Sequence, residues 1–151
     1  MFGVASWNPA VGGVVGVAVK PKEFLSLGIE GRAAWLTTNV AGEPISAMTA
    51  GGILSACGHL RWFVGCALGH LGVLNLDFSK STYNEASGSH FKPGFGARFG
   101  AEIPISSSFS LHGVVDAIVL RNGHRAWAGE TLIVDQPPIM IGGQLLGGWE
   151  F

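Results

Sequence analysis

Ile139-Met140-Ile141-Gly142-Gly143-Gln144-Leu145-Leu146-Gly147-Gly148-Trp149-Glu150-Phe151 is the stretch from which the architecture can be argued. Side chains along a β-strand alternate between two faces, so every second residue shares a side. One side of this stretch is apolar or glycine throughout and ends in two aromatic residues. It contains Ile139, Ile141, Gly143, Leu145, Gly147, Trp149 and Phe151. The stretch therefore predicts a long strand with a single apolar face and an aromatic end.

Composition narrows the class of protein. The chain has 151 residues, enough for one domain, of which 48% are hydrophobic and 13% charged, and its mean hydropathy is +0.40. Since there is no uninterrupted apolar run of about 18 residues, a helical membrane span is excluded. The remaining choices are a very buried core or a barrel in lipid. The 24 glycines favour strands and turns over long helices, and a net charge of −1 excludes nucleic-acid-binding electrostatics.

The same alternation recurs along the chain. It predicts seven strands, at residues 11–20, 24–36, 47–57, 62–76, 93–103, 109–120 and 139–151. Residues 1–5 are expected to be the end of a further strand, which gives about eight. The connections alternate between short turns, at Pro21, 58–61 and 106–108, and long polar loops, at 37–45, 77–92 and 121–138. Short turns at one end and long loops at the other are typical of barrels in bacterial outer membranes.

On these features, and on a last strand that ends at Phe151, the chain resembles the bacterial outer-membrane β-barrel family, with an eight-stranded membrane domain of the OmpA type. Residues 25–35, 57–68 and 95–104 are similar to short predicted outer-membrane proteins of unknown activity. The resemblance implies an antiparallel up-and-down barrel in the bacterial outer membrane, in contact with its lipid. It also implies short periplasmic turns, longer outer loops, and recognition of the last strand by the barrel-assembly machinery through Phe151.

Aromatic residues offer a separate test. With the predicted topology they fall near strand ends, where a membrane barrel carries two interfacial girdles. The girdle residues are Trp35 on the loop side and Trp62, Phe109, Trp149 and Phe151 on the turn side. A soluble β-sandwich also begins and ends strands with aromatics. It would need a polar outer face, whereas here the predicted outward faces are almost free of charge.

Charged residues fall on the predicted inward faces. They are Glu30, Arg32, Arg98, Glu102, Asp116 and His112. An eight-stranded barrel is just wide enough for side chains to fill, and buried charges must pair, so we expect a salt-bridged network in the lumen. A proton or ion path would use the same residues. His112 with Asp116 and a nearby serine could also belong to a hydrolase, but no matching motif accompanies them. The other histidines lack metal-ligand spacing, so neither a catalytic site, a metal nor a cofactor is predicted.

Cys57 and Cys66 flank the turn around Leu60 and Arg61. Pairing across that hairpin sets them nearly opposite each other and inward, so an oxidising compartment favours a disulfide. Two small apolar fillers are the alternative.

The expected function is a structural or surface-interaction role for a single membrane domain, residues 1–151. A narrow pore, a lipid-modifying enzyme and a soluble β-barrel that binds an apolar ligand are the alternatives. Residues 1–5 are too short to cover the last strand, so we expect the first strand to be truncated. A signal peptide and the rest of that strand should then lie upstream.

Overall fold

A computed structural model of the chain describes residues 9–36, 45–78, 88–106, 108–121, 125–128, 131–135 and 137–149. Within these ranges the protein is all-β, without a helix. The strands are β1 (Ala10–Lys22), β2 (Leu25–Leu36), β3 (Ile45–Leu60), β4 (Phe63–Phe78), β5 (Gly88–Pro104), β6 (Phe109–Leu120), β7 (Arg125–Ala128), β8 (Thr131–Asp135) and β9 (Ile139–Trp149). No helix in this part of the chain is long and apolar enough to cross a membrane.

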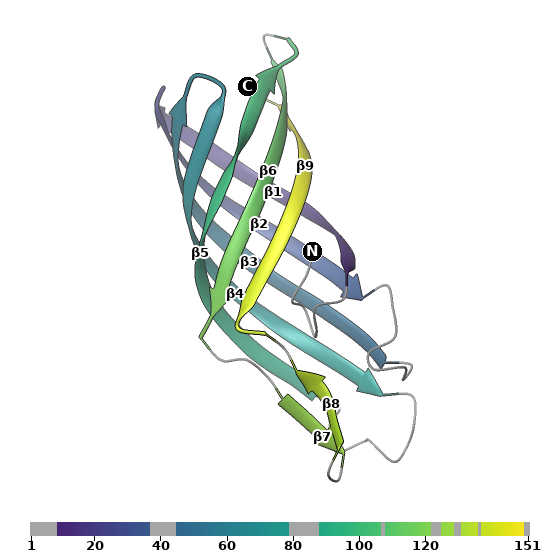
Figure 1. Cartoon of the computed structure of the whole chain (residues 1–151). Helices are drawn as coiled ribbons and strands as arrows, with labels where there is room; N and C mark the ends of the chain where they lie inside the picture. The colour runs from purple at the N-terminus through teal and green to yellow at the C-terminus, as the bar shows by residue number, and fades with distance from the viewer. Residues whose placement is uncertain are drawn as a thin grey trace.

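Seven strands form one antiparallel sheet in the order β1-β2-β3-β4-β5-β6-β9, which coils into a nearly closed barrel (Figure 1). The predicted fold class and the seven predicted strands are therefore confirmed. The eighth predicted strand, at residues 1–5, lies outside the described residues. One end of the barrel carries the connections at residues 23–24, 61–62 and 105–108, and we call it the tight-turn end. The opposite end, where β2, β4 and β6 finish, is the loop end.

Two of the predicted loops are shorter than expected. β5 begins at Gly88 and pairs there with Leu76 of β4, so β5 occupies the last part of the predicted loop 77–92. The outward residue Ser89 pairs with Asn75 of β4, and its polar side chain predicts a loop although the strand continues. The predicted loop 121–138 contains β7 and β8, which form a separate two-stranded sheet beyond the barrel strands (Figure 1).

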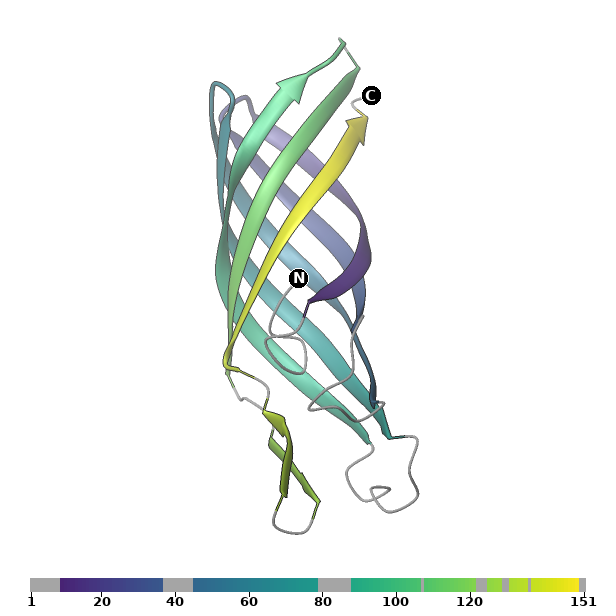
Figure 2. The same cartoon turned by 45° about the vertical axis from the view of Figure 1, so that its right-hand side comes forward.

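The barrel sheet has two free edges, β1 and β9, which face each other across an opening (Figure 2). Neighbouring strands are antiparallel throughout, so after six steps around the sheet β9 runs in the same direction as β1. Both begin at the loop end, where Ala10 pairs with Leu36 and Ile139 with Val119. A strand that closed this opening by pairing antiparallel with both β1 and β9 would have to run in the direction opposite to theirs.

The outer face of the barrel is apolar. In β6 every second residue from Leu111 to Val119 is exposed, and the residues between them, from Val114 to Leu120, are buried. The same alternation holds in β2, whose outward side chains include Leu27, Ile29 and Trp35, at 47%, 60% and 51% exposure. The side chains that a soluble protein would bury thus lie outside, and several of the charged side chains lie inside.

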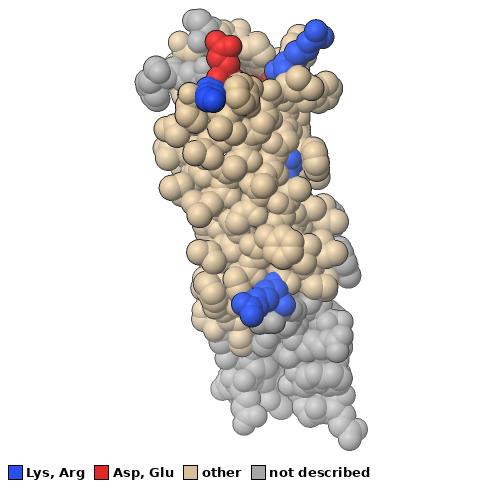
Figure 3. Space-filling model, turned by 90° about the vertical axis from the view of Figure 1, so that its left-hand side faces the viewer, with Lys and Arg blue, Asp and Glu red and all other residues tan. Residues whose placement is uncertain are grey.

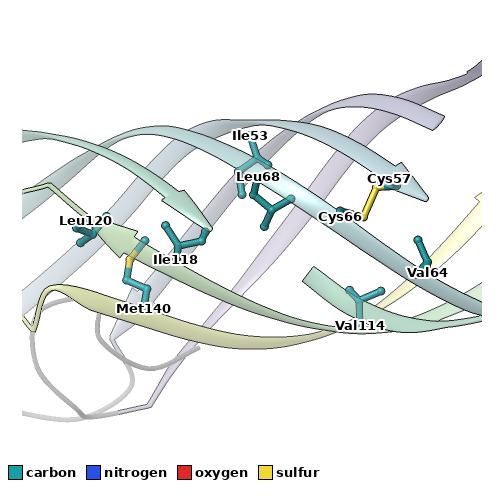
Figure 4. Packing of buried hydrophobic residues seen from close by; sticks show 9 residues of the cluster. All are labelled: Ile53, Cys57, Val64, Cys66, Leu68, Val114, Ile118, Leu120 and Met140. Atoms are coloured by element: carbon teal, nitrogen blue, oxygen red, sulfur yellow. A yellow bond between two sulfur atoms is a disulfide. The ribbon is translucent and has the colours of Figure 1, made fainter. Parts of the chain in front are cut away.

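Part of the interior is hydrophobic. The buried cluster consists of Ile53, Cys57, Val64, Cys66, Leu68, Val114, Ile118, Leu120 and Met140 (Figure 4). Ile118, Leu120 and Met140 lie together on one side of this view, and Val64, Val114 and the disulfide lie on the other. Inward glycines let the wall curve closely: a Cβ atom at Gly96 would lie 2.1 Å from the carbonyl oxygen of Ala117. Between the two apolar groups lies the charged site.

Candidate functional site

A cluster of charged side chains crosses the middle of the lumen. Alternation along β2 directs both Glu30 and Arg32 inward, and Arg98 of β5 and Asp116 of β6 are direct cross-strand partners. On β6, Asp116 is flanked by the buried Val114 and Ile118, so the cluster lies between apolar layers. Strands far apart in the sheet order, β2 and β5, thereby contribute to one site.

Arg98 is the centre of this cluster. Its Nε donates a hydrogen bond to Oδ1 of Asp116 at 2.7 Å, and its Nη2 donates to Oε2 of Glu30, also at 2.7 Å. Its Nη1 donates to the other oxygen of Glu30, so the guanidinium makes a two-pronged contact with that carboxylate. Arg98 therefore ties the wall formed by β5 and β6 to β2 across the lumen.

Asp116 accepts hydrogen bonds from three side chains. Besides Arg98, they are Arg32, whose Nη2 lies 2.7 Å from Oδ2, and Gln144, whose Nε2 lies 2.6 Å from the same oxygen. Arg32 Nη2 also lies 3.9 Å from Oε2 of Glu30. With two arginines and two carboxylates, the formal charges of the network cancel. Burial of Arg32, Arg98 and Asp116 at 6%, 5% and 1% exposure is tolerable because each charge has an opposite partner.

The six residues predicted as one network separate into two groups. Glu30, Arg32, Arg98 and Asp116 form the central network, whereas Glu102 and His112 lie nearer the tight-turn end. Glu102 Oε1 is 3.4 Å from Lys20 Nζ and 4.0 Å from His112 Nε2, and its Oε2 is 3.3 Å from His59 Nδ1. Sequence reasoning placed these charges inward but did not predict that they would meet at two different heights.

The group at the tight-turn end also contains two serine–histidine contacts. Ser26 Oγ lies 2.8 Å from His59 Nε2, and Ser110 Oγ lies 2.8 Å from His112 Nε2. His112 thus contacts Ser110 and Glu102 and not Asp116, with which it could be associated from sequence. Neither Ser26 nor His59 was a predicted site residue. The signal that could have found them is that both occupy inward positions within two residues of a strand end.

Several buried polar atoms have no hydrogen-bond partner among the described residues. They are Nε and Nη1 of Arg32, both ring nitrogens of His70, and Oε1 of Gln144. His70 is 3% exposed and faces the lumen, as its alternation predicts. These donors and acceptors are enclosed within the barrel and have almost no surface accessible to solvent.

The predicted disulfide is confirmed. Cys57 of β3 and Cys66 of β4 are direct cross-strand partners, their Cα atoms are 4.0 Å apart, and their Sγ atoms are bonded at 2.10 Å. Nine positions separate them in the sequence. Both are buried inward, next to Val64, so the bond contributes to the apolar layer at the tight-turn end.

Replacing Cys57 and Cys66 together with alanine is expected to lower the free energy of unfolding by about 2 kcal/mol, because the closed loop is short and the hairpin already restrains it. Chemical denaturation with and without reductant measures the effect. Reductant should destabilise the wild-type protein and leave the double variant unchanged. Two free thiols in the denatured, unreduced protein would contradict the assignment.

The predicted girdle residues lie at both ends of the barrel wall. Trp62 and Trp149, at 64% and 66% exposure, lie at the tight-turn end, and Trp35 lies near the end of β2 at the loop end. The Phe109 and Trp149 rings pack edge to face with centroids 5.5 Å apart. Phe151 lies outside the described residues.

No group of three or more His, Cys, Asp or Glu side chains suited to holding a metal ion occurs in the described part of the chain. The contacts present at these sites are ion pairs in the central network and serine–histidine contacts at the tight-turn end. Comparisons with protein-family models, with curated proteins and with solved structures found no match to this chain.

Proposed function

We propose that this protein is a bacterial outer-membrane β-barrel with a structural or surface-interaction role, its lumen filled by the charge network and its long loops facing outward. In this arrangement the tight-turn end faces the periplasm. The belt of outward side chains contacts membrane lipid. The last strand is the segment that the assembly machinery would recognise through Phe151, and the position of β9 at a sheet edge suits pairing with another strand.

The observation that carries the proposal is the outer face of the barrel wall. In the body of the seven strands, the described outward positions hold apolar residues or glycine, apart from Asn75 and Ser89 near the loop end. Figure 3 shows one side of this surface, a broad band almost free of charged atoms, with most of the charged side chains gathered toward its two ends. An apolar belt that surrounds the molecule far exceeds the patches that monomeric soluble proteins expose.

The inward placement of charge supports the same proposal. A soluble β-protein places its charges on the outside and its apolar residues in the core, whereas here Arg32, Arg98 and Asp116 are buried and Phe95, Phe99 and Val115 are 69%, 70% and 56% exposed. Strands of 11 to 17 residues are also long enough to cross a bilayer when tilted.

Folding in the presence and absence of lipid tests the proposal. The denatured chain should fold in detergent micelles or phospholipid vesicles, and the folded form should migrate differently from the boiled form on a gel. In buffer alone it should aggregate. A chain that refolds in buffer without detergent to a stable monomer would overturn the membrane assignment.

Orientation is tested by epitope insertion in intact cells. A tag inserted within residues 79–87, at the loop end, should be accessible to antibody on intact bacteria. The matched control is the same tag inserted within residues 105–108, at the tight-turn end, which should become accessible only after the outer membrane is permeabilised. Labelling of the control tag alone on intact cells would reverse the orientation.

A narrow pore is the second candidate, and it is favoured by the unpartnered lumenal atoms of Arg32, His70 and Gln144. Water molecules that entered the lumen would supply the hydrogen bonds that these buried atoms lack. In planar bilayers the wild-type protein would then show small, stable conductance steps. An absence of steps in the wild-type protein would leave the structural role as the function.

A further inference from the structure

A serine, a histidine and a glutamate come together at the tight-turn end of the lumen from three different strands. Ser26 is the second residue of β2, His59 is the last but one of β3, and Glu102 lies two residues before the end of β5. Ser26 Oγ is 2.8 Å from His59 Nε2, and His59 Nδ1 is 3.3 Å from Glu102 Oε2. The imidazole ring therefore lies between a hydroxyl group and a carboxylate, with one nitrogen close to each.

We call the chain of Ser26, His59 and Glu102 the relay. The hydrogen-bonding capacity of these groups determines which of them donates each proton. An ionised carboxylate can only accept, so in the neutral imidazole the proton lies on Nδ1, next to Glu102. Nε2 is then the acceptor, and the hydroxyl of Ser26 must donate to it. A serine hydroxyl that donates to a histidine oriented by a carboxylate is the arrangement that activates a serine for nucleophilic attack.

The second serine–histidine pair in the same region lacks this arrangement. Ser110 Oγ and Glu102 Oε1 both lie near the same ring nitrogen of His112, Nε2, at 2.8 Å and 4.0 Å. The carboxylate and the hydroxyl therefore do not contact opposite nitrogens, and Glu102 cannot hold the His112 proton away from Ser110. The chain thus contains a matched pair of serines beside histidines, of which only one has the relay geometry.

Access to the site is from the tight-turn end. The side chains of His59 and Glu102 are 14% and 16% exposed, and Ser26 is 6% exposed. His59 is held in place by its backbone N–H, which donates to the carbonyl of Phe24 at 3.0 Å. Glu102 is held in the same way by the carbonyl of Trp62, at 2.8 Å. The site is thus partly open, and the low exposure of Ser26 restricts it to a small acyl group.

We propose that Ser26, His59 and Glu102 form a nucleophilic site that reacts with short acyl esters at the tight-turn end of the barrel. Ser26 Oγ bonds to the acyl carbon, and its proton passes to His59 Nε2. The bond from the acyl carbon to the leaving alcohol then breaks, and the alcohol takes that proton. Water attacks the acyl-serine by the same route, which releases the acid and restores Ser26. Glu102 positions the imidazole and stabilises its charged form.

Covalent labelling of the folded protein with a small fluorophosphonate tests this proposal. Ser26 Oγ should bond to phosphorus and displace fluoride, and the released proton should pass to His59. Intact mass should rise by a single adduct, and peptide mapping should locate it at Ser26. Because the adduct is mapped on the wild-type protein, this result does not depend on any variant folding.

Variants then separate the relay from a merely accessible serine. Ser26→Ala should abolish labelling, and the matched control Ser110→Ala should label as fast as wild type. His59→Gln should slow labelling by about 100-fold or more, the usual contribution of a general base. Hydrolysis of p-nitrophenyl acetate should follow the same order and should be lost when the protein is unfolded. No adduct on folded wild-type protein, an adduct at Ser110 instead, or equal labelling of Ser26→Ala would overturn the proposal.

Discussion

Replacing Arg98 with methionine is expected to lower the free energy of unfolding by about 3–5 kcal/mol, because the carboxylates of Glu30 and Asp116 would lose the cation between them while still buried. Arg98 makes hydrogen bonds to both, and it is the link between β5 and β2 across the lumen. Denaturant titration of the protein in vesicles measures the change, with the gel-mobility difference between folded and unfolded forms as the readout. Arg121→Met, at an exposed position at the loop end, is the matched control and should change little.

The same network offers a rescue. Combining Arg98→Met with Glu30→Gln removes one cation and one anion, leaves Arg32 paired with Asp116, and should restore a large part of the lost stability, since neutral replacements of buried ion pairs are often tolerated. If Arg98→Met were as stable as Arg121→Met, the lumen would be hydrated enough to solvate both carboxylates. The plugged-lumen description would then be wrong.

Replacing Val115 with arginine is expected to destabilise the protein in a phospholipid bilayer by about 2–4 kcal/mol. Val115 lies midway along β6, faces outward at 56% exposure and pairs with Phe99 and Gly143. In a protein surrounded by water the same change at an exposed site would usually be worth less than about 0.5 kcal/mol in either direction. The substitution thus separates a lipid-facing wall from a water-facing one.

Ser89→Arg is the matched control for this substitution. Ser89 is also outward and exposed, but it pairs with Asn75 near the loop end, where the apolar belt has ended. We expect its stability in bilayers to stay close to that of the wild type. Equal and small effects at both positions would contradict the membrane assignment, and equal and large effects would place Ser89 within the belt.

Much of the wall could be predicted from the two-residue period alone. The alternation between residues 24 and 36 correctly assigned Leu27, Ile29 and Trp35 to the outer face and Glu30 and Arg32 to the lumen. It also predicted that Cys57 and Cys66 meet, because a short hairpin turn determines which residues face each other. These features depend on local geometry, which the order of residues along a strand or turn determines directly.

The height at which side chains meet across the lumen could not be predicted in the same way. Alternation tells which residues point inward, but the tilt and stagger of the strands determine which of them are level with one another. Glu102 and Arg98 share a face of β5, yet Glu102 contacts Lys20 and His59 while Arg98 contacts Glu30 and Asp116. For this reason the predicted single network is two groups, and the contact between Ser26 and His59 could not be anticipated.

Strand ends were missed for a different reason. Polar residues such as Ser89 indicate solvent and therefore predict a loop, although a hairpin can continue in water once its strands are paired. The hairpin of β7 and β8 within 121–138 is a second case. Strands of four or five residues carry too few positions to establish a period.

The bond between Cys57 and Cys66 has a consequence for how the wall is assembled. A slip of one residue between two strands moves every side chain to the opposite face, and here it would direct Leu54 inward and His59 into the apolar belt. The two thiols are opposite each other only when β3 and β4 are in the correct register. Oxidation of the two thiols therefore covalently fixes the hairpin only in the correct register. A misaligned hairpin stays reduced and can still realign.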